Sequence, residues 1–122
     1  LGVDFTARSL QEQLKNKGLP WELAKGFDGS AILGEWQETD PAALEQGYGF
    51  TLQIGDEVRQ SGHTSEMLFN FAEIIAFVSK YFTLKMGDMI YTGTPAGVGP
   101  VQVGDSLSGY LNGRLNLRCK VC

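Results

Sequence analysis

The chain has 122 residues, of which 43% are hydrophobic and 20% charged, and it carries a formal net charge of −4. This length and composition are typical of one small globular domain and exclude a disordered or fibrous chain. The acidic charge and the lack of a basic cluster argue against nucleic acid and anionic membranes as partners, because both are bound through lysine and arginine.

The first predicted elements are a strand and an amphipathic helix. Residues 1–5 predict the end of an apolar strand. The Thr6 hydroxyl offers an N-cap to a helix predicted over residues 7–17. Gly18 is the expected end of this helix, whose leucines mark its buried side.

The middle of the chain predicts a loop region followed by a β-hairpin. Residues 25–33 are rich in small side chains and predict a loop or short strand, whereas the acidic residues 35–46 predict a solvent-exposed excursion. Residues 50–54 and 58–61 predict paired strands, because Gly55 between them supplies the positive φ that a tight turn needs.

Apolar residues with helical spacing predict a second helix over residues 65–80, capped by Thr64 or Ser65. The longest apolar stretch, residues 69–82, is interrupted by polar side chains and is too short to cross a bilayer. The start of the chain shows no signal-peptide pattern. We therefore expect a cytoplasmic protein with no membrane partner.

The last third of the chain predicts antiparallel β-structure. Residues 88–91 predict a short strand, and Asn112-Gly113 is a type I′ turn signal between strands over residues 107–111 and 114–121. The predicted fold class is therefore α+β, mainly β with two helices, in a single domain over residues 1–122.

A polar stripe is the first candidate site. Asp4, Arg8, Gln11 and Lys15 are spaced along one side of the first helix, with Asp4 at the junction of strand and helix. Such a stripe can hold a hard divalent cation on the aspartate and a substrate carboxylate on the planar arginine. The alternative is the solvated face of an amphipathic helix, and spacing alone favours that alternative.

Lys25 and the glycine-rich segment 91–105 are the other candidates. Lys25 lies between apolar neighbours, where it can bind an enolate or carboxylate oxygen or simply extend over apolar surface. In the segment, Gly93 and Gly97 permit backbone N–H groups to face an oxyanion, and Thr94 adds a hydroxyl donor. It is not a P-loop, since no Gly-Lys-Ser/Thr follows, and taken alone it is as well explained as a structural turn.

Two further residue types are interpreted as structural. Cys119 and Cys122 have the spacing of redox and zinc motifs, but three residues along a strand place their sulfurs on opposite faces. His63 is the single histidine and precedes the second helix, with no Ser–His–Asp or Cys–His arrangement to use it.

These candidates occur together in three stretches, GVDFTARSLQ (2–11), KGLPWELAKGFDGSA (17–31) and TSEMLFNFAEIIAFVSKYFTLKMGDMIYTGTPAGVGPVQVGD (64–105). With them, the chain resembles the C-terminal portion of the fumarylacetoacetate hydrolase family, closest to its acylpyruvase and oxaloacetate decarboxylase branch. The resemblance extends over essentially the whole chain. It implies the mixed β-roll or sandwich of that family, incomplete at the N-terminus.

The resemblance also implies roles for individual residues. Asp4 is expected to be a ligand of Mg²⁺ or Mn²⁺, and Arg8 and Gln11 are expected to orient the substrate. Lys25 is expected to bind the oxo-acid oxygens, which makes Lys25 and Arg8 the catalytic candidates. Thr94 is expected to contact the substrate carboxylate.

The implied function is cleavage of C–C bonds in small 2-oxo acids, such as acylpyruvates, fumarylpyruvate or oxaloacetate, through a metal-stabilised enolate. Isomerisation or decarboxylation of a hydroxymuconate, also found in the family, shares that enolate. The family resemblance further implies a homodimer. The alternative is a truncated, non-catalytic relative that binds a small carboxylate or a partner chain; a nucleotide-binding module is disfavoured by the acidic charge.

Members of the family complete the metal site with a Glu-x-Glu pair upstream of the aspartate, and no Glu-x-Glu occurs in these 122 residues. The lid that carries the His–Glu base of the acylpyruvase branch is also expected upstream. We therefore expect this chain to be the C-terminal part of a longer catalytic domain, and to be an enzyme only together with those upstream residues.

Overall fold

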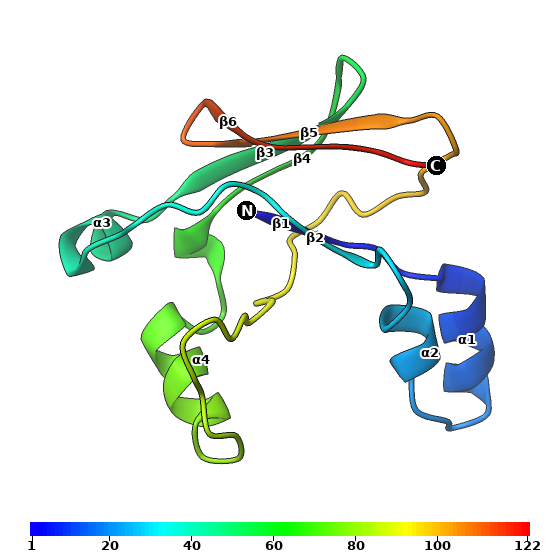
Figure 1. Cartoon of the computed structure of the whole chain (residues 1–122), viewed down its shortest axis with the longest axis horizontal. Coiled ribbons are helices and arrows are strands. Elements are labelled where there is room, and N and C mark those ends of the chain that lie inside the picture. Colours follow the sequence, from blue (N-terminus) through cyan, green and yellow to red (C-terminus); the bar gives the residue numbers. More distant parts are fainter.

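A computed structural model describes residues 1–122 and contains two antiparallel sheets and four α-helices (Figure 1). One sheet has two strands, and the other has four strands in the order β4-β3-β5-β6. The elements are β1 (Gly2–Asp4), α1 (Arg8–Asn16), α2 (Glu22–Lys25), β2 (Ala31–Leu33), α3 (Pro41–Gln46), β3 (Gly49–Ile54), β4 (Glu57–His63), a 3-10 turn (Thr64–Glu66), α4 (Phe71–Val78), β5 (Ser106–Leu111) and β6 (Arg114–Lys120). The predicted α+β class is confirmed, with two short helices, α2 and α3, beyond the two predicted.

Both predicted hairpins are confirmed, and their turns explain them. β3 and β4 are joined at Gly55, whose φ of +57° is a conformation that glycine adopts without strain. β5 and β6 are joined at Asn112 (φ +47°) and Gly113 (φ +76°), as a type I′ turn requires. β3 and β5 pair with each other, so the two hairpins form one sheet.

The first helix is confirmed at nearly the predicted bounds, but its predicted cap is wrong. The N-cap residue of α1 is Ala7, and no side chain caps the helix. The Thr6 hydroxyl instead accepts a hydrogen bond from Lys25. A contact to a residue far along the chain has taken the place of the local one.

The second helix is shorter than predicted. Residues 64–66 form a 3-10 turn, Met67 is extended, and α4 begins only at Phe71. Asn70 caps α4 through the backbone N–H of Glu73, whose side chain in turn accepts from the N–H of Asn70. This capping box fixes the start of the helix, whereas the apolar periodicity continues beyond it.

Two other segments differ from the prediction. The acidic excursion 35–46 contains the helix α3, which Asp40 caps by accepting from the N–H of Ala43. Residues 88–91 form no strand; the segment is held instead through Tyr91, whose hydroxyl donates to the carbonyl of Ile32 on β2. The short strand predicted there is therefore wrong.

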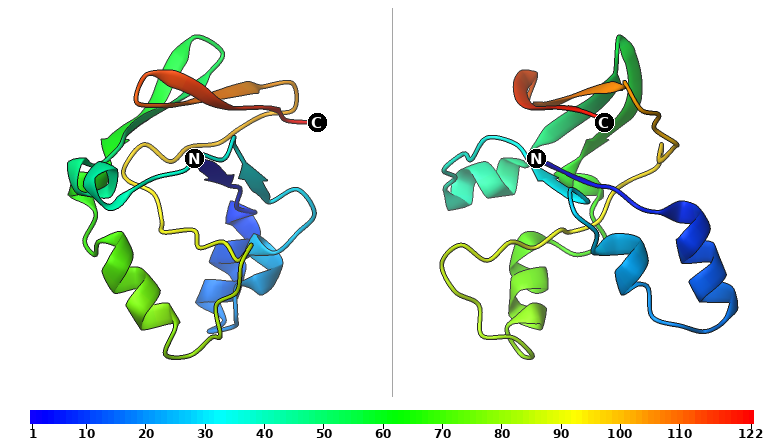
Figure 2. Two further views of the ribbon diagram at one scale, coloured as in Figure 1. Left: turned by 60° about the vertical axis from the view of Figure 1, so that its left-hand side comes forward. Right: turned by 45° about the vertical axis from the view of Figure 1, so that its right-hand side comes forward.

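The buried core is small. Ala24, Leu107 and Leu117 are the buried hydrophobic residues. α4 buries none of its side chains, and Figures 1 and 2 show it on the same side of the four-stranded sheet as α1 and α2, apart from both. A wide apolar surface is therefore exposed. None of the helices is both long and apolar enough to cross a membrane.

Candidate functional site

The end of β1 and the end of α2 bring two predicted site residues together. Asp4 is the last residue of β1, and Lys25 is the last residue of α2. The backbone just after β1 is tied to α2, since the N–H of Ala7 donates to the carbonyl of Ala24 at 3.0 Å. The Lys25 Nζ lies 2.6 Å from Asp4 Oδ2 and 2.8 Å from Thr6 Oγ1. The structure therefore places lysine, carboxylate and hydroxyl in one cluster.

This cluster is open to solvent. The Lys25 and Asp4 side chains are 38% and 45% exposed, so their ion pair adds little to stability. Ala24, the neighbour of Lys25, is completely buried and anchors α2 beneath it. The backbone of Lys25 is therefore fixed by the buried Ala24, while its ammonium group remains accessible to a ligand.

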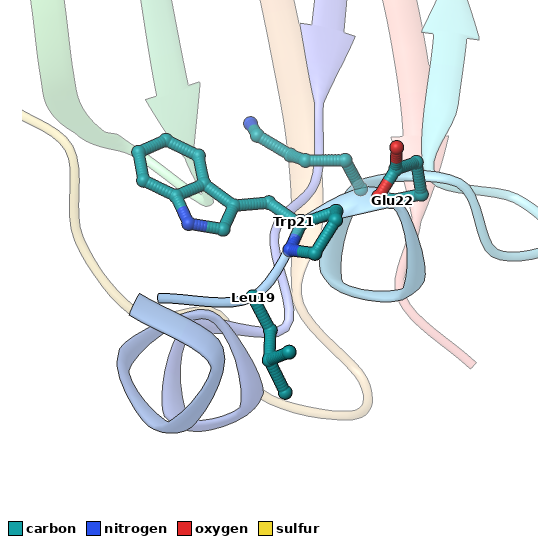
Figure 3. A pocket seen from close by; sticks show the side chains of 5 residues that line it. Leu19, Trp21 and Glu22 are labelled. Carbon is teal, nitrogen blue, oxygen red and sulfur yellow. The ribbon is translucent and has the colours of Figure 1, made fainter. Parts of the chain in front are cut away.

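A shallow hollow of about 470 Å³ adjoins Lys25 (Figure 3). Its other walls come from the turn between α1 and α2 and from the start of α2, namely Leu19, Pro20, Trp21 and Glu22. Trp21 and Leu19 are each nearly half exposed. The hollow is therefore lined mainly by apolar side chains, with the Lys25 ammonium and the Glu22 carboxylate as its charged groups.

Tyr91 connects the start of the glycine-rich segment to the two-stranded sheet of β1 and β2. Its hydroxyl donates to Ile32 at 3.0 Å, and its ring approaches Gly2 so closely that a Cβ there would meet it at 3.0 Å. Burial, together with the negative charge of Asp4, raises the pKa of the Tyr91 phenol. The phenol therefore remains a proton donor over the whole neutral range.

Arg8 and Gln11 form a second pair, on the exposed side of α1. The Arg8 Nη1 donates to Gln11 Oε1 at 2.7 Å across one helical turn. No hydrogen bond joins this pair to Asp4 or Lys25. As predicted, Asp4 lies on the strand and outside the helix proper, so the polar stripe divides into two groups.

Thr94, in the glycine-rich segment, is held against β4. Gln60 Nε2 donates to Thr94 Oγ1 at 2.8 Å, and it lies 3.2 Å from the carbonyl of Pro95 and 3.3 Å from that of Ala96. Gly97 packs so closely on the Arg59 carbonyl that a Cβ would overlap it. The segment is therefore fixed against β4 and is not a free turn. We call residues 91–105 the rim of the candidate site.

His63 has a local structural role. It ends β4, and its Nδ1 lies 3.2 Å from the N–H of Ser65 and 2.7 Å from the hydroxyl of the same serine. The imidazole therefore caps the 3-10 turn, in agreement with its interpretation as structural.

Sequence reasoning missed three residues of these clusters, Thr6, Gln60 and Tyr91. Thr6 is assigned to a helix cap on local grounds, and Gln60 is one polar residue among several on a strand. Their partners lie 19 and 34 residues away, respectively. The one available signal is for Tyr91, which immediately precedes Thr92 at the start of the glycine-rich segment.

The residues of this chain do not by themselves fit a complete metal site. No three His, Cys, Asp or Glu side chains gather where they could hold a metal ion. Asp4 offers two oxygens, one of which is engaged by Lys25. Mg²⁺ and Mn²⁺ prefer six oxygen ligands in an octahedral arrangement, so Asp4 could supply only part of a site.

The family described as "Fumarylacetoacetate (FAA) hydrolase C-terminal" matches residues 1–122. The oxaloacetate tautomerase FAHD1 of Mus musculus, a mitochondrial protein, is 44% identical over 125 residues, covering 99% of this chain and 55% of that protein. The chain spans about half the length of the curated relatives it matches.

Two solved structures are similar along nearly the whole chain. A putative fumarylacetoacetate hydrolase family protein from Yersinia pestis CO92 has a TM-score of 0.91 at 39% identity, covering 99% of this chain and 57% of that one. The fumarylpyruvate hydrolase from Pseudomonas aeruginosa, in complex with Mn²⁺ and pyruvate, has a TM-score of 0.89 at 34% identity, covering 98% and 52%. Both proteins therefore share the fold described above.

Proposed function

Because the chain belongs to the fumarylacetoacetate hydrolase family, we propose that it forms part of an enzyme acting on small 2-oxo carboxylic acids. The observation that carries the proposal is the Lys25 cluster, an accessible ammonium held by Asp4 and Thr6 beside a shallow hollow. The names of the relatives support the substrate class, since they include an oxaloacetate tautomerase and a fumarylpyruvate hydrolase.

Lys25 is proposed to bind the oxygen on which negative charge develops. An ammonium group has three N–H donors, and two of them are directed to Asp4 and Thr6. The third remains for a substrate oxygen. Reactions at a 2-oxo acid that form an enolate place a full charge on that oxygen, and a fixed cation stabilises it.

Arg8, Gln11 and Thr94 are proposed to bind and orient the carboxylate. The guanidinium of Arg8 is planar and matches a carboxylate with two parallel hydrogen bonds. Gln11 accepts one of its N–H groups and so restricts its rotation. Thr94 adds a hydroxyl from the fixed rim.

The finer predictions belong to this proposal as well. Mn²⁺ in the Pseudomonas aeruginosa structure supports use of a divalent cation in the family, with Asp4 as the ligand expected in this chain. A complete shell would need ligands beyond those of the 122 residues, and none of the roles given above depends on it. C–C bond cleavage, isomerisation, the homodimer and the cytoplasmic location also stay predictions.

The test is turnover of oxaloacetate and of an acylpyruvate by the intact protein and by Lys25→Met. Methionine keeps an unbranched apolar side chain, one atom shorter than that of lysine, and removes all three donors. Loss of one preorganised donor to an oxyanion lowers kcat by about 100-fold to 1,000-fold. Lys17→Met is the matched control, because Lys17 is exposed at the end of the neighbouring α1 and its side chain makes no hydrogen bond or ion pair.

Each other outcome has a distinct meaning. Full activity in Lys25→Met would remove Lys25 from the chemistry. Binding of pyruvate without turnover, in the presence of added Mg²⁺ or Mn²⁺, would support the non-catalytic relative that binds a small carboxylate. If the intact protein neither binds a 2-oxo acid nor turns it over, the proposed function itself is refuted.

A further inference from the structure

One glutamine controls the rim of the proposed site. The side-chain nitrogen of Gln60 faces three oxygens of the glycine-rich segment: the Thr94 hydroxyl at 2.8 Å and the carbonyls of Pro95 and Ala96 at 3.2 and 3.3 Å. Two of these three oxygens are carbonyls, which accept hydrogen bonds and never donate. The amide nitrogen must therefore point toward the segment, because the amide oxygen would be repelled there.

A β-bulge aims this glutamine. Along β3 and β4, Leu52 pairs with Gln60 but the next residue, Gln53, pairs with Val58, which leaves Arg59 as an extra residue in β4. A bulge re-aims the neighbouring side chains and exposes a backbone carbonyl. Gly97 packs on that carbonyl of Arg59, so the bulge and the glutamine grip the segment at adjacent points.

The direction of the hydrogen bond fixes the role of Thr94. Because Gln60 Nε2 can only donate, Thr94 Oγ1 accepts from it. The hydroxyl hydrogen of Thr94 is then free to point away from β4, and Thr94 is exposed at the surface. A carboxylate oxygen can only accept, so it needs a hydroxyl that is held in this donating state.

We propose that Gln60 is a positioning residue, which holds the rim in place and sets Thr94 as a hydrogen-bond donor to the substrate carboxylate. This inference rests on the proposed function, since it needs a carboxylate at Thr94. Gln60 itself does not touch the substrate and acts only through Thr94 and the backbone of the rim.

The test compares Gln60→Met with wild type in the intact protein, with pyruvate as the probe. Methionine keeps the length of the side chain and removes the amide. We expect the Kd for pyruvate to rise about tenfold or more, as for the loss of a hydrogen bond to a charged group. The KM for oxaloacetate should rise by a similar factor, with a smaller change in kcat. Gln53→Met is the matched control on β3, because its side chain makes no hydrogen bond, and it should leave the Kd within about twofold.

A double-mutant cycle separates positioning from general support. If Gln60 acts through Thr94, Gln60→Met should weaken pyruvate binding far less in a Thr94→Val background than in wild type. An undiminished effect in that background would overturn the inference. So would an unchanged Kd in Gln60→Met.

A second variant keeps the inference testable if Gln60→Met fails to fold. Gln60→Glu has nearly the same shape, but its carboxylate accepts the Thr94 proton and repels the two carbonyls. It should weaken pyruvate binding about tenfold or more, and binding at wild-type strength would overturn the inference. If Lys25→Met impairs binding and the Gln60 variants do not, this inference alone fails; if wild type binds no 2-oxo acid, the proposed function fails with it.

Discussion

Substitution of one glycine in the rim should measure how much the site depends on the loop's attachment to β4. Gly97 has a φ of +96°, and a Cβ added to it would overlap the carbonyl oxygen of Arg59. Gly97→Ala therefore imposes both backbone strain and a clash with backbone that cannot rotate aside. The segment must leave β4, and the hydrogen bonds from Gln60 are lost with it.

The same loop provides controls that separate the two costs. Gly93 also has a φ of +96° but has open space around it, so Gly93→Ala suffers strain alone, about 1–3 kcal/mol. Gly99 has neither a positive φ nor a neighbour within 4 Å of an added Cβ, and Gly99→Ala should change stability by about 0.5 kcal/mol or less. Replacing glycine by alanine also lowers the conformational entropy of the unfolded chain. This contribution is common to the three variants and cancels when they are compared with one another.

The assay is urea unfolding of the three variants of the intact protein, together with pyruvate binding. We expect the free energy of unfolding to fall in the order Gly99→Ala, Gly93→Ala, Gly97→Ala, and pyruvate binding to be weakest in Gly97→Ala. If Gly97→Ala matches Gly93→Ala in both stability and affinity, the contact with Arg59 does not hold the rim and the reasoning is refuted.

Two further predictions concern the β-sheet. Leu107, 1% exposed on β5, is the largest fully buried side chain. Leu107→Ala should therefore lower the free energy of unfolding, measured by urea titration, by about 2–5 kcal/mol. Leu115→Ala, at a residue that is 43% exposed on β6, is the control and should lower it less. Burial raises the pKa of the Cys119 thiol, so its reactive thiolate forms only at higher pH. Near pH 8, iodoacetamide should therefore label the exposed Cys122 before Cys119, as detected by peptide mass spectrometry. Equal labelling of the two cysteines would contradict this prediction.

The fold was most predictable where a single turn dictates the geometry. Gly55 and Asn112-Gly113 specify hairpins by themselves, and both appear where the sequence places them. The helix α4 was predicted too long, since apolar spacing continues through Met67 although the backbone there is extended. The capping box of Asn70 and Glu73 marks the true start of the helix, and its residues are visible in the sequence.

The candidate site was predictable as a set of residues but not as a set of contacts. Asp4 and Lys25 were each identified, yet their direct ion pair and its third member, Thr6, depend on how α2 packs behind β1. The local pattern predicts that Thr6 caps α1, but in the folded chain its hydroxyl accepts a hydrogen bond from Lys25. Contacts across 19 to 34 residues arise from tertiary packing, which spacing rules do not encode.

The glycine-rich segment is attached to both sheets of the fold. Tyr91, before the first glycine, is bonded to β2 in the two-stranded sheet, whereas Thr94 is bonded to β4 in the four-stranded sheet. Gly93, with its positive φ, lies between these two attachments. A second link joins the same sheets, because the Asn116 side chain on β6 donates to the carbonyl of Glu35 just after β2. The position of Thr94 relative to Lys25 is therefore set by the packing of the sheets against each other, and a substitution that loosens the sheets should weaken carboxylate binding even when every proposed contact residue is intact.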